Sequence, residues 1–457
     1  MSRPPEIVDI HIDAVTAGGD GEGMLGTVRV AVPFSIPGEL VRVQLLRSRD
    51  RHEATGRMLS VLTPSPHRVV PRCRHFGPAA EAACGGCTWQ HLSYPAQLEL
   101  KRALVADAVG RVLRQPPPVE PTIPSGSGTP WHYRQKVHFV FGEAGRNGRL
   151  TTMGHYARGT RRVVPVVECP VHDDRGNEVA FRLAEALGSS GRSEPPLTSV
   201  VARVSRSAGD VMVTLVTEGP PGRRLRDISR KVLTPDAGVT SLHASIHSGH
   251  GSLIFGDRTR QVSGTDRIAD EIDGVTYLIS PTAFFQTNGQ AAAELVRAVM
   301  RAVPAHLPVL ELYCGSGLFA LPLAKRGHTV IGIESNPVAV ADAVASRHAN
   351  RIPPARCRFV ATTAESGVTR IHPRDARCVV LDPPRSGAST AVLDEVLQRL
   401  RPDLLVYVSC DSQSLAADLG RVEQGGYRIT RLQPLDMFPH TAEVETVAVA
   451  RPVEART

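Results

Sequence analysis

Cys410 is the residue of this chain whose setting first suggests catalysis. It follows Leu404 to Ser409, a run of apolar side chains typical of a buried strand, and leucines at helical spacing come next. In an open α/β sheet, ligands bind beyond the carboxyl ends of the strands. The N–H groups of a helix N-terminus would also favour a thiolate at this junction. Because a lone cysteine is more often a small buried side chain, the prediction of a nucleophile depends on its neighbours.

Two acids near the end of the chain could serve this thiol as a general base. Glu443 and Glu445 lie within Met437 to Val449, which the pattern predicts to be a loop that leads into a final strand. A carboxylate beside a reacting centre can accept its proton. The simpler interpretation of either acid is an exposed charge at the edge of a sheet. The sequence therefore leaves both acids as candidates.

Four other cysteines have the spacing of metal ligands. Cys84 and Cys87 form a C-x2-C pair, Cys73 precedes them, and Cys169 is the candidate for the fourth ligand. In a reducing cytoplasm such clusters indicate a metal rather than disulfides. Four thiolates fit either structural zinc or an iron–sulfur cluster, and their spacing does not distinguish the two. Nearby histidines that could replace a cysteine ligand are His75, His91 and His172.

The C-terminal part contains a pattern typical of an adenosine-binding fold. Residues 308–312 predict a strand, Gly315 and Gly317 a tight turn, and Glu334 ends the next strand. Such glycines let a ligand approach the backbone, and the acid can bind ribose hydroxyls. This combination indicates an adenosine-containing ligand such as S-adenosylmethionine. A third strand ends in Asp382-Pro-Pro-Arg, a motif of methyltransferases that act on planar nitrogen or base substrates.

The coarse pattern predicts three domains. Short strands separated by Gly/Pro turns suggest a small β-barrel at the N-terminus. Tyr94 to Leu113 predicts a helix, and alternating strands dominate from Trp131 to about Val216. From about residue 280, buried strands alternate with helices, which is typical of a doubly wound α/β domain. The predicted domains are residues 1–63, 64–275 and 276–457.

The composition favours a globular protein with a polyanionic partner. The 457 residues are 42% hydrophobic and 21% charged, with a net charge of +8, and most of this excess lies in residues 63–275. A basic protein of this kind suits nucleic acid. No apolar run is long enough to cross a bilayer, and Met1 to Asp13 lacks the apolar core of a signal peptide. We therefore expect a cytoplasmic protein without a membrane partner.

Together these motifs resemble the RNA 5-methyluridine (uracil-C5) methyltransferase family over nearly the whole chain. The matching segments are Cys73 with Cys84-Gly-Gly-Cys87-Thr-Trp-Gln-His91, Tyr133-Arg-Gln-Lys136, Phe284-Phe-Gln286-Thr-Asn288, Leu312-Tyr-Cys-Gly-Ser-Gly317, Asp382-Pro-Pro-Arg-Ser-Gly387, Tyr407-Val-Ser-Cys-Asp411 and Phe438-Pro-His-Thr441 with Val444-Glu445-Thr446. The chain differs from the usual family pattern at Glu311, Leu318, Asp411-Ser412 and Glu443.

The resemblance implies a fold and a set of site residues. The fold is a Rossmann-like class I S-adenosylmethionine-dependent methyltransferase domain, preceded by an OB-like β-barrel (TRAM) that binds RNA and by a β-rich central domain. By the resemblance, Cys410 is the nucleophile and Glu445 the base. Members that keep all four cysteines bind a 4Fe-4S cluster, which favours that cluster over zinc. The residues that match cofactor contacts are Gln286, Tyr313, Glu334 and Asp382.

The implied activity is transfer of a methyl group from S-adenosylmethionine to C5 of a specific uridine in rRNA or tRNA. Cys410 would add at C6 of the base, and Glu445 would remove the C5 proton. We expect a monomer. One alternative is a non-catalytic RNA-binding or assembly protein on a methyltransferase scaffold. Another, suggested by Asp382-Pro-Pro alone, is a methyltransferase directed at a base nitrogen or a glutamine.

Overall fold

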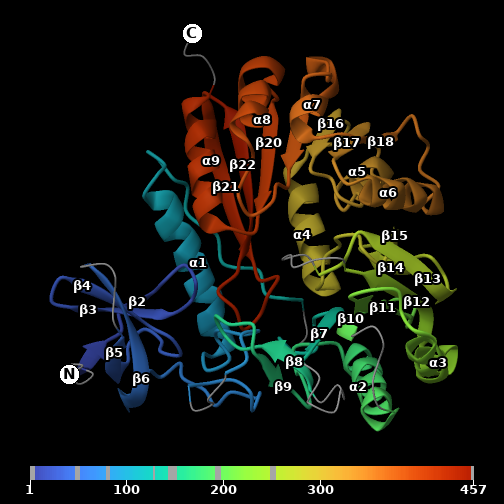
Figure 1. Cartoon of the computed structure of the whole chain (residues 1–457). Coiled ribbons are helices and arrows are strands. Elements are labelled where there is room, and N and C mark those ends of the chain that lie inside the picture. Colours follow the sequence, from blue (N-terminus) through green and yellow to red (C-terminus); the bar gives the residue numbers. More distant parts are fainter. Residues whose placement is uncertain are drawn as a thin grey trace.

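The computed structural model describes residues 6–46, 52–78, 83–126, 129–142, 152–190, 197–247 and 254–453, without the side chains of residues 188–190 and 224. Three large sheets follow one another along the chain (Figure 1). Within these ranges, no helix is both long and apolar enough to cross a membrane.

The first sheet is a six-stranded, strongly curled barrel-like sheet. Gly23 allows the curl, because a Cβ at this position would lie only 2.1 Å from the carbonyl oxygen of His11. The core is aliphatic, with Ile10, Val30 and Val41 among its buried side chains. The expectation of an N-terminal barrel is confirmed. Its strands, in the order β1-β5-β6-β4-β3-β2, are β1 (Ile7–His11), β2 (Ala14–Val15), β3 (Gly21–Leu25), β4 (Val28–Val32), β5 (Leu40–Leu46) and β6 (Glu53–Thr63).

The central part contains a seven-stranded sheet preceded by helix α1 (Tyr94–Gly110), which confirms the helix predicted there. Helix α2 (Asp174–Ser190) was not predicted, although Val179, Leu183 and Leu187 recur at helical spacing and pack on the sheet. The other helical elements of the central part are helix α3 (Arg223–Val232) and the turn η1 (Pro235–Ala237). The strand order is β13-β12-β11-β10-β7-β8-β9, with β7 (Lys136–Phe141), β8 (Met153–Tyr156), β9 (Val163–Pro165), β10 (Leu197–Val204), β11 (Val211–Thr217), β12 (Val239–Ile246) and β13 (Arg258–Gly264).

The last sheet is doubly wound, as predicted. Its five parallel strands have the order β18-β17-β16-β19-β20, followed by β22 and β21, and β22 is antiparallel to both of its neighbours. The chain order reverses between β16 and β19, which is where such folds bind ligands. The strands are β16 (Val309–Leu312), β17 (Val330–Glu334), β18 (Cys357–Ala361), β19 (Cys378–Leu381), β20 (Leu404–Ser409), β21 (Tyr427–Leu435) and β22 (Glu445–Pro452).

Alternate residues of these strands enter two separate apolar cores, one on each face of the sheet. In β20, Leu404 and Val406 join one core, whereas Leu405 and Tyr407 join the other. Helices cover both faces (Figure 1), as the near-continuous apolar strands require. The helical segments are α4 (Gly289–Ala302), α5 (Ala320–Lys325), α6 (Pro337–Ala349), α7 (Ala364–Val368), η2 (Pro373–Asp375), α8 (Thr390–Asp394), the π-helix η3 (Glu395–Leu400) and α9 (Ser412–Gln424).

The division into residues 1–63, 64–275 and 276–457 stays a proposal. Its second boundary falls at the tip of the hairpin formed by β14 (Ile268–Ile272) and β15 (Val275–Ile279). Both strands contribute to a core of the doubly wound domain, so a boundary before Ile268 would keep this hairpin whole.

A buried ion pair joins α1 to the loop before β22. The Lys101 ammonium donates to the Asp436 carboxylate and, at 3.0 Å, to the carbonyl of Phe438. Neither charged side chain is exposed, at 0% each. Burial lowers the pKa of Lys101, and the Asp436 charge opposes that shift. The pair therefore holds the loop that leads to Glu445 against a helix more than 300 residues earlier in the chain.

Replacement of Lys101 by methionine is expected to destabilise the protein by about 3–5 kcal/mol, because Asp436 would remain buried without its partner. The free energy of unfolding can be followed by the fluorescence of Trp131, which stacks on His440 of the same loop. Lys101→Met with Asp436→Leu should recover most of the loss, since no lone charge then remains. A single variant as stable as the wild type would contradict this account.

Candidate functional site

The carboxyl edge of the doubly wound sheet brings several of the predicted site residues together. The pairs Leu312–Leu381 and Leu381–Tyr407 align the ends of β16, β19 and β20. Tyr313 and Asp382 are the residues that follow the first two strands, and Cys410 follows the third. β22 runs the other way, so it begins at this edge.

Cys410 and Glu445 are neighbours across the β20–β22 pair. Ser409 pairs with Thr446 in antiparallel register, which places the residue after Ser409 beside the one before Thr446. Glu445 is 4% exposed, and burial, with the charge of Asp382, raises the pKa of its carboxyl well above the usual value. A protonatable carboxyl thus lies next to the thiol.

The environment of Cys410 disfavours its thiolate, contrary to the expectation from the helix N-terminus. Burial raises the pKa of the thiol to about 12, the charges of Glu445 and Asp382 raise it too, and the Arg385 guanidinium opposes them. Burial is the largest cause of the shift, and the N–H groups at the start of α9 do not offset it. Two of these N–H groups are already used, because the Asp411 carboxylate accepts from Gln413 N at 3.0 Å and from Ser414 N at 2.9 Å.

Alkylation of Cys410 by iodoacetamide is therefore expected to accelerate about tenfold per pH unit between roughly pH 7 and 9, because the thiolate fraction rises tenfold per unit below the pKa. Arg385→Gln should slow the reaction, since it removes the positive neighbour. Mass spectrometry of the peptide containing Cys410 measures the rate, and Arg399→Gln on η3 is a matched control. A plateau below pH 8 would contradict the raised pKa.

The glycine turn after β16 is open and held by Glu334. Tyr313, Gly315 and Gly317 have φ values of 63°, 52° and 84°, which favour glycine at the last two positions. A Cβ on Gly315 would meet nothing within 4 Å, so the backbone is accessible there. Glu334 accepts from Gly315 N at 3.0 Å and, through its other oxygen, from Asn336 N at 2.7 Å.

Acidic side chains surround this turn. Burial and the charge of Glu334 raise the pKa of Asp382 to about 7. Beneath it, Glu311 is 1% exposed, and burial, with Asp382, raises the pKa of its carboxyl well above the usual value. Glu311 Oε2 has no hydrogen-bond partner among the described residues. This concentration of carboxyl groups suits a cationic ligand.

Gln286 lines a space that Tyr313, Glu334 and Asp382 do not line. It lines a small space together with Gln135 and Asp270, between the β14–β15 hairpin and the central sheet. None of the hydrogen bonds of the described residues links it to Tyr313, Glu334 or Asp382. The next residues are anchored, because Asn288 Nδ2 donates to the carbonyl of Met437 at 3.0 Å. The cofactor role of Gln286 stays a prediction.

The four predicted ligand cysteines line one cavity of about 170 Å³. Gln90 Nε2 donates to Cys87 Sγ at 3.2 Å, and Gly86 N to Cys84 Sγ at 3.4 Å. Burial raises the pKa of all four thiols, that of Cys169 to about 11. None of the four is in a disulfide. The structure therefore brings together Cys73, Cys84, Cys87 and Cys169, far along the chain from Cys410.

Histidines also reach this cavity. His75 and His172 line it, as the sequence analysis considered, whereas His91 stacks on Phe76 with ring centroids 5.4 Å apart. His138 on β7 and His155 on β8 line it too, although neither was predicted as a ligand from the sequence. Their signal was weak, because β7 and β8 pair only across a long connection.

Comparison with known proteins gives consistent matches. The family model described as tRNA (uracil-5-)-methyltransferase matches residues 259–451. An uncharacterized RNA methyltransferase of Gloeobacter violaceus is 34% identical over 97% of this chain and 96% of its own length. Another, from Thermosynechococcus vestitus, is 34% identical over 97% of both chains.

A solved structure matches the whole architecture. The tRNA (uracil-54, C5)-methyltransferase of Pyrococcus abyssi, in complex with S-adenosyl-L-homocysteine, superposes with a TM-score of 0.76 and 28% identity. The match covers 97% of this chain and 100% of that one. The similarity therefore extends beyond the doubly wound sheet to the barrel and the central part.

Proposed function

Because the chain belongs to the tRNA (uracil-5-)-methyltransferase family of S-adenosylmethionine-dependent RNA methyltransferases, we propose that it methylates C5 of a specific uridine in rRNA or tRNA through a covalent adduct of Cys410. The observation that carries this proposal is the β20–β22 register, which makes Cys410 and Glu445 neighbours at the ligand edge of the sheet. A nucleophile with a carboxyl beside it is the arrangement that such chemistry needs.

The proposed reaction begins with the weak nucleophilicity of uracil C5. The Cys410 thiolate adds at C6, and the electrons of the C5–C6 double bond move to form an enolate. S-adenosylmethionine would supply an electrophilic methyl group to C5 and would leave as S-adenosylhomocysteine. Glu445 then accepts the C5 proton, and the electrons left at C5 restore the double bond as the Cys410–C6 bond breaks. The target base must leave any stack to be reached on both faces.

Other residues of the edge have proposed supporting roles. Asp382 is close enough to Cys410 and Glu445 to affect the pKa of both, and in its protonated form it could donate a hydrogen bond to the enolate oxygen. We propose Tyr313, Glu334 and Gln286 as cofactor contacts. A bound sulfonium would add positive charge near Cys410. This charge would lower the pKa of the thiol, so a larger fraction of it would be thiolate at neutral pH.

The experiment that tests this function uses labelled S-adenosylmethionine and RNA from a strain lacking the gene. Methyl transfer with recovery of 5-methyluridine at a defined position supports the proposal. Incorporation without 5-methyluridine would favour a nitrogen-directed enzyme, and Cys410→Ser would then be mild. Absence of incorporation would favour the RNA-binding or assembly protein. Sites missing from the strain's total RNA identify whether the target is ribosomal or transfer RNA.

We also propose that the cavity of the four cysteines holds a 4Fe-4S cluster rather than zinc. Around one zinc ion, Zn–S bonds of about 2.3 Å place the sulfurs about 3.8 Å apart. Among the described side chains, the group of ligand atoms that lie within 4.8 Å of one another is His155, Cys169 and His172. Cys73, Cys84 and Cys87 are thus more widely spaced, around a cavity large enough for several atoms. The proposed role is structural, because no step of the reaction needs redox chemistry.

Anaerobically purified protein is expected to be brown and to contain about four irons per chain. Iron and sulfide analysis, with the visible absorbance, measures the cluster. Cys73→Ser should lose most of the iron, whereas Cys378→Ser is a matched control, since that thiol is buried in β19 far from the cavity. Stoichiometric zinc without iron in wild type that has been kept anaerobic throughout, so that no cluster is lost to oxygen, would contradict the proposal.

The remaining predictions are proposals as well. We propose that the N-terminal barrel is an RNA-binding TRAM domain and that the basic central part contacts the RNA. We further propose that the protein acts as a monomer in the cytoplasm.

A further inference from the structure

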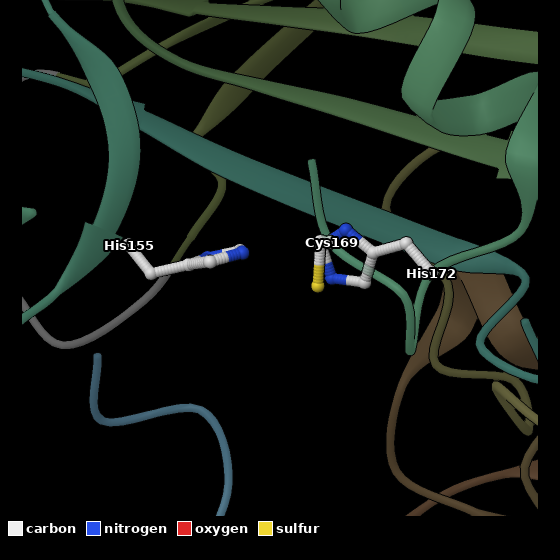
Figure 2. A group of neighbouring side chains, drawn as sticks. All are labelled: His155, Cys169 and His172. Carbon is white, nitrogen blue, oxygen red and sulfur yellow. The ribbon is translucent and has the colours of Figure 1, made fainter. Parts of the chain in front are cut away.

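Three side chains at the cysteine cavity converge on one point. His155 lies on β8, and Cys169 and His172 lie in the turn between β9 and α2. Figure 2 shows the His155 ring pointing toward Cys169 and His172, with the other two side chains close together. Their ligand atoms all lie within 4.8 Å of one another.

The two imidazoles are held in place, yet each has one buried ring nitrogen without a hydrogen-bond partner among the described residues. Phe139 packs against both rings, with centroid distances of 4.8 Å to His155 and 5.0 Å to His172. His172 is 5% exposed. His155 Nε2 and His172 Nδ1 are buried, and neither has a partner within the described part of the chain. A buried polar nitrogen without a partner is costly, so these atoms indicate a ligand.

Cys169 is fixed by its own backbone contacts. Its carbonyl accepts from Asn177 Nδ2 at 2.9 Å and from His172 N at 3.1 Å. These bonds hold the turn in which both Cys169 and His172 lie. The third side chain comes from a separate strand, so the convergence is a property of the folded domain.

We propose that in protein without the cluster His155, Cys169 and His172 form a mononuclear site for a divalent transition metal, and that this metal is zinc. Zinc prefers nitrogen and sulfur ligands, with bonds of about 2.0–2.3 Å, which place neighbouring ligand atoms about 3.5 Å apart. The three side chains therefore need to approach by only about 1 Å. On binding, Cys169 loses its thiol proton and forms a metal–sulfur bond. The fourth position faces the cavity and is open to water or a further thiolate.

The site shares Cys169 with the proposed 4Fe-4S cluster, so the two metal centres exclude each other. Protein that has lost its cluster would take up one zinc ion at this site. Metal content would then show whether the protein still has its cluster, with about four irons per chain in the cluster form and one zinc per chain in the cluster-free form. The mutual exclusion rests on the cluster proposal, whereas the mononuclear site does not.

Cobalt(II) titration of the full-length variant Cys73→Ser/Cys84→Ser/Cys87→Ser tests the site, because this variant cannot hold a four-thiolate centre. One Co²⁺ per chain is expected, with the charge-transfer absorbance of a single thiolate. Adding His155→Gln or His172→Gln should weaken binding by more than the roughly 10–100-fold that loss of an outer partner costs. His138→Gln is the matched control, since His138 lines the same cavity and its Nε2 is likewise unpartnered among the described residues.

In the folded triple variant, the absence of Co²⁺ binding would overturn the proposal, and so would equal weakening by His138→Gln. Histidine variants that only shift the reduction potential of the cluster would mean that the imidazoles donate to its sulfurs instead. If the triple variant does not fold, X-ray absorption of cluster-free wild type loaded with zinc decides, with two nitrogens and one sulfur expected and four sulfurs excluding the site. Methyl transfer is assayed separately, so failure here leaves the proposed function untouched.

Discussion

Replacement of Cys410 by alanine is expected to lower methyl transfer to RNA by roughly 10⁴-fold or more, the scale seen when a nucleophile that forms a covalent intermediate is removed. Without addition at C6, uracil C5 is too weak a nucleophile to take the methyl group. RNA and cofactor binding should change little, because the β20 strand and the Asp411 cap of α9 remain.

RNA with 5-fluorouridine at the target position provides the decisive measurement. Fluorine cannot leave C5 as a proton does, so the adduct between Cys410 and C6 persists after methyl transfer and appears as a slowly migrating band on a denaturing gel. The alanine variant should form none of it. Cys357→Ala is a matched control, since burial raises the pKa of that thiol to about 12 as well. Cys357 is the first residue of β18, whereas Cys410 follows the last residue of β20. An adduct in the Cys410 variant would refute the nucleophile assignment.

The position of Cys410 could be predicted because it depends on local signals. An apolar run followed by a polar helical pattern marks a strand end, and β20 does end at Ser409. The state of the thiol could not be predicted in the same way. Its pKa depends on burial first and then on Glu445, Asp382 and Arg385, which come from separate segments of the chain.

The two candidate bases differ in ways that their local sequence does not show. The residue pattern alone left both Glu443 and Glu445 open, and the resemblance favoured Glu445. In the structure the two acids have different surroundings, because β22 lies between β20 and β21 and begins at Glu445. Glu445 begins the strand and is buried beside Cys410. Glu443 remains in the loop, where its carboxylate accepts from Arg385 at 2.9 Å. Strand order within a sheet is set by packing across the whole domain, which no local pattern records.

The same distinction explains the metal ligands. The C-x2-C spacing of cysteines predicts a metal site directly from the sequence, and all four predicted ligand cysteines line the cavity. His155 lies on β8, which pairs with β7 and β9, the strands directly before and after it in the chain. Its approach to Cys169 follows from this pairing and not from any spacing of ligand residues in the sequence. The family resemblance implied the four cysteines as ligands, but it implied no role for His155.

Replacement of Glu445 by glutamine is expected to stop the reaction after methyl transfer rather than before it. Glutamine cannot accept the C5 proton, so the methylated base should stay bonded to Cys410, and turnover should fall by about 10²–10⁴-fold. Removing the Glu445 charge also removes one of the influences that raise the pKa of Cys410. Adduct formation should therefore be no slower than in the wild type.

This asymmetry separates the base from a merely structural acid. With unmodified RNA and labelled S-adenosylmethionine, label should accumulate in a covalent protein–RNA band in Glu445→Gln, whereas Glu443→Gln should release methylated RNA. Loss of adduct formation together with turnover would place Glu445 in binding or folding instead. Accumulation requires that Cys410 attack, that C5 take the methyl group, and that only proton removal fail. The variant thus tests the order of the proposed steps as well as the residue that performs the last one.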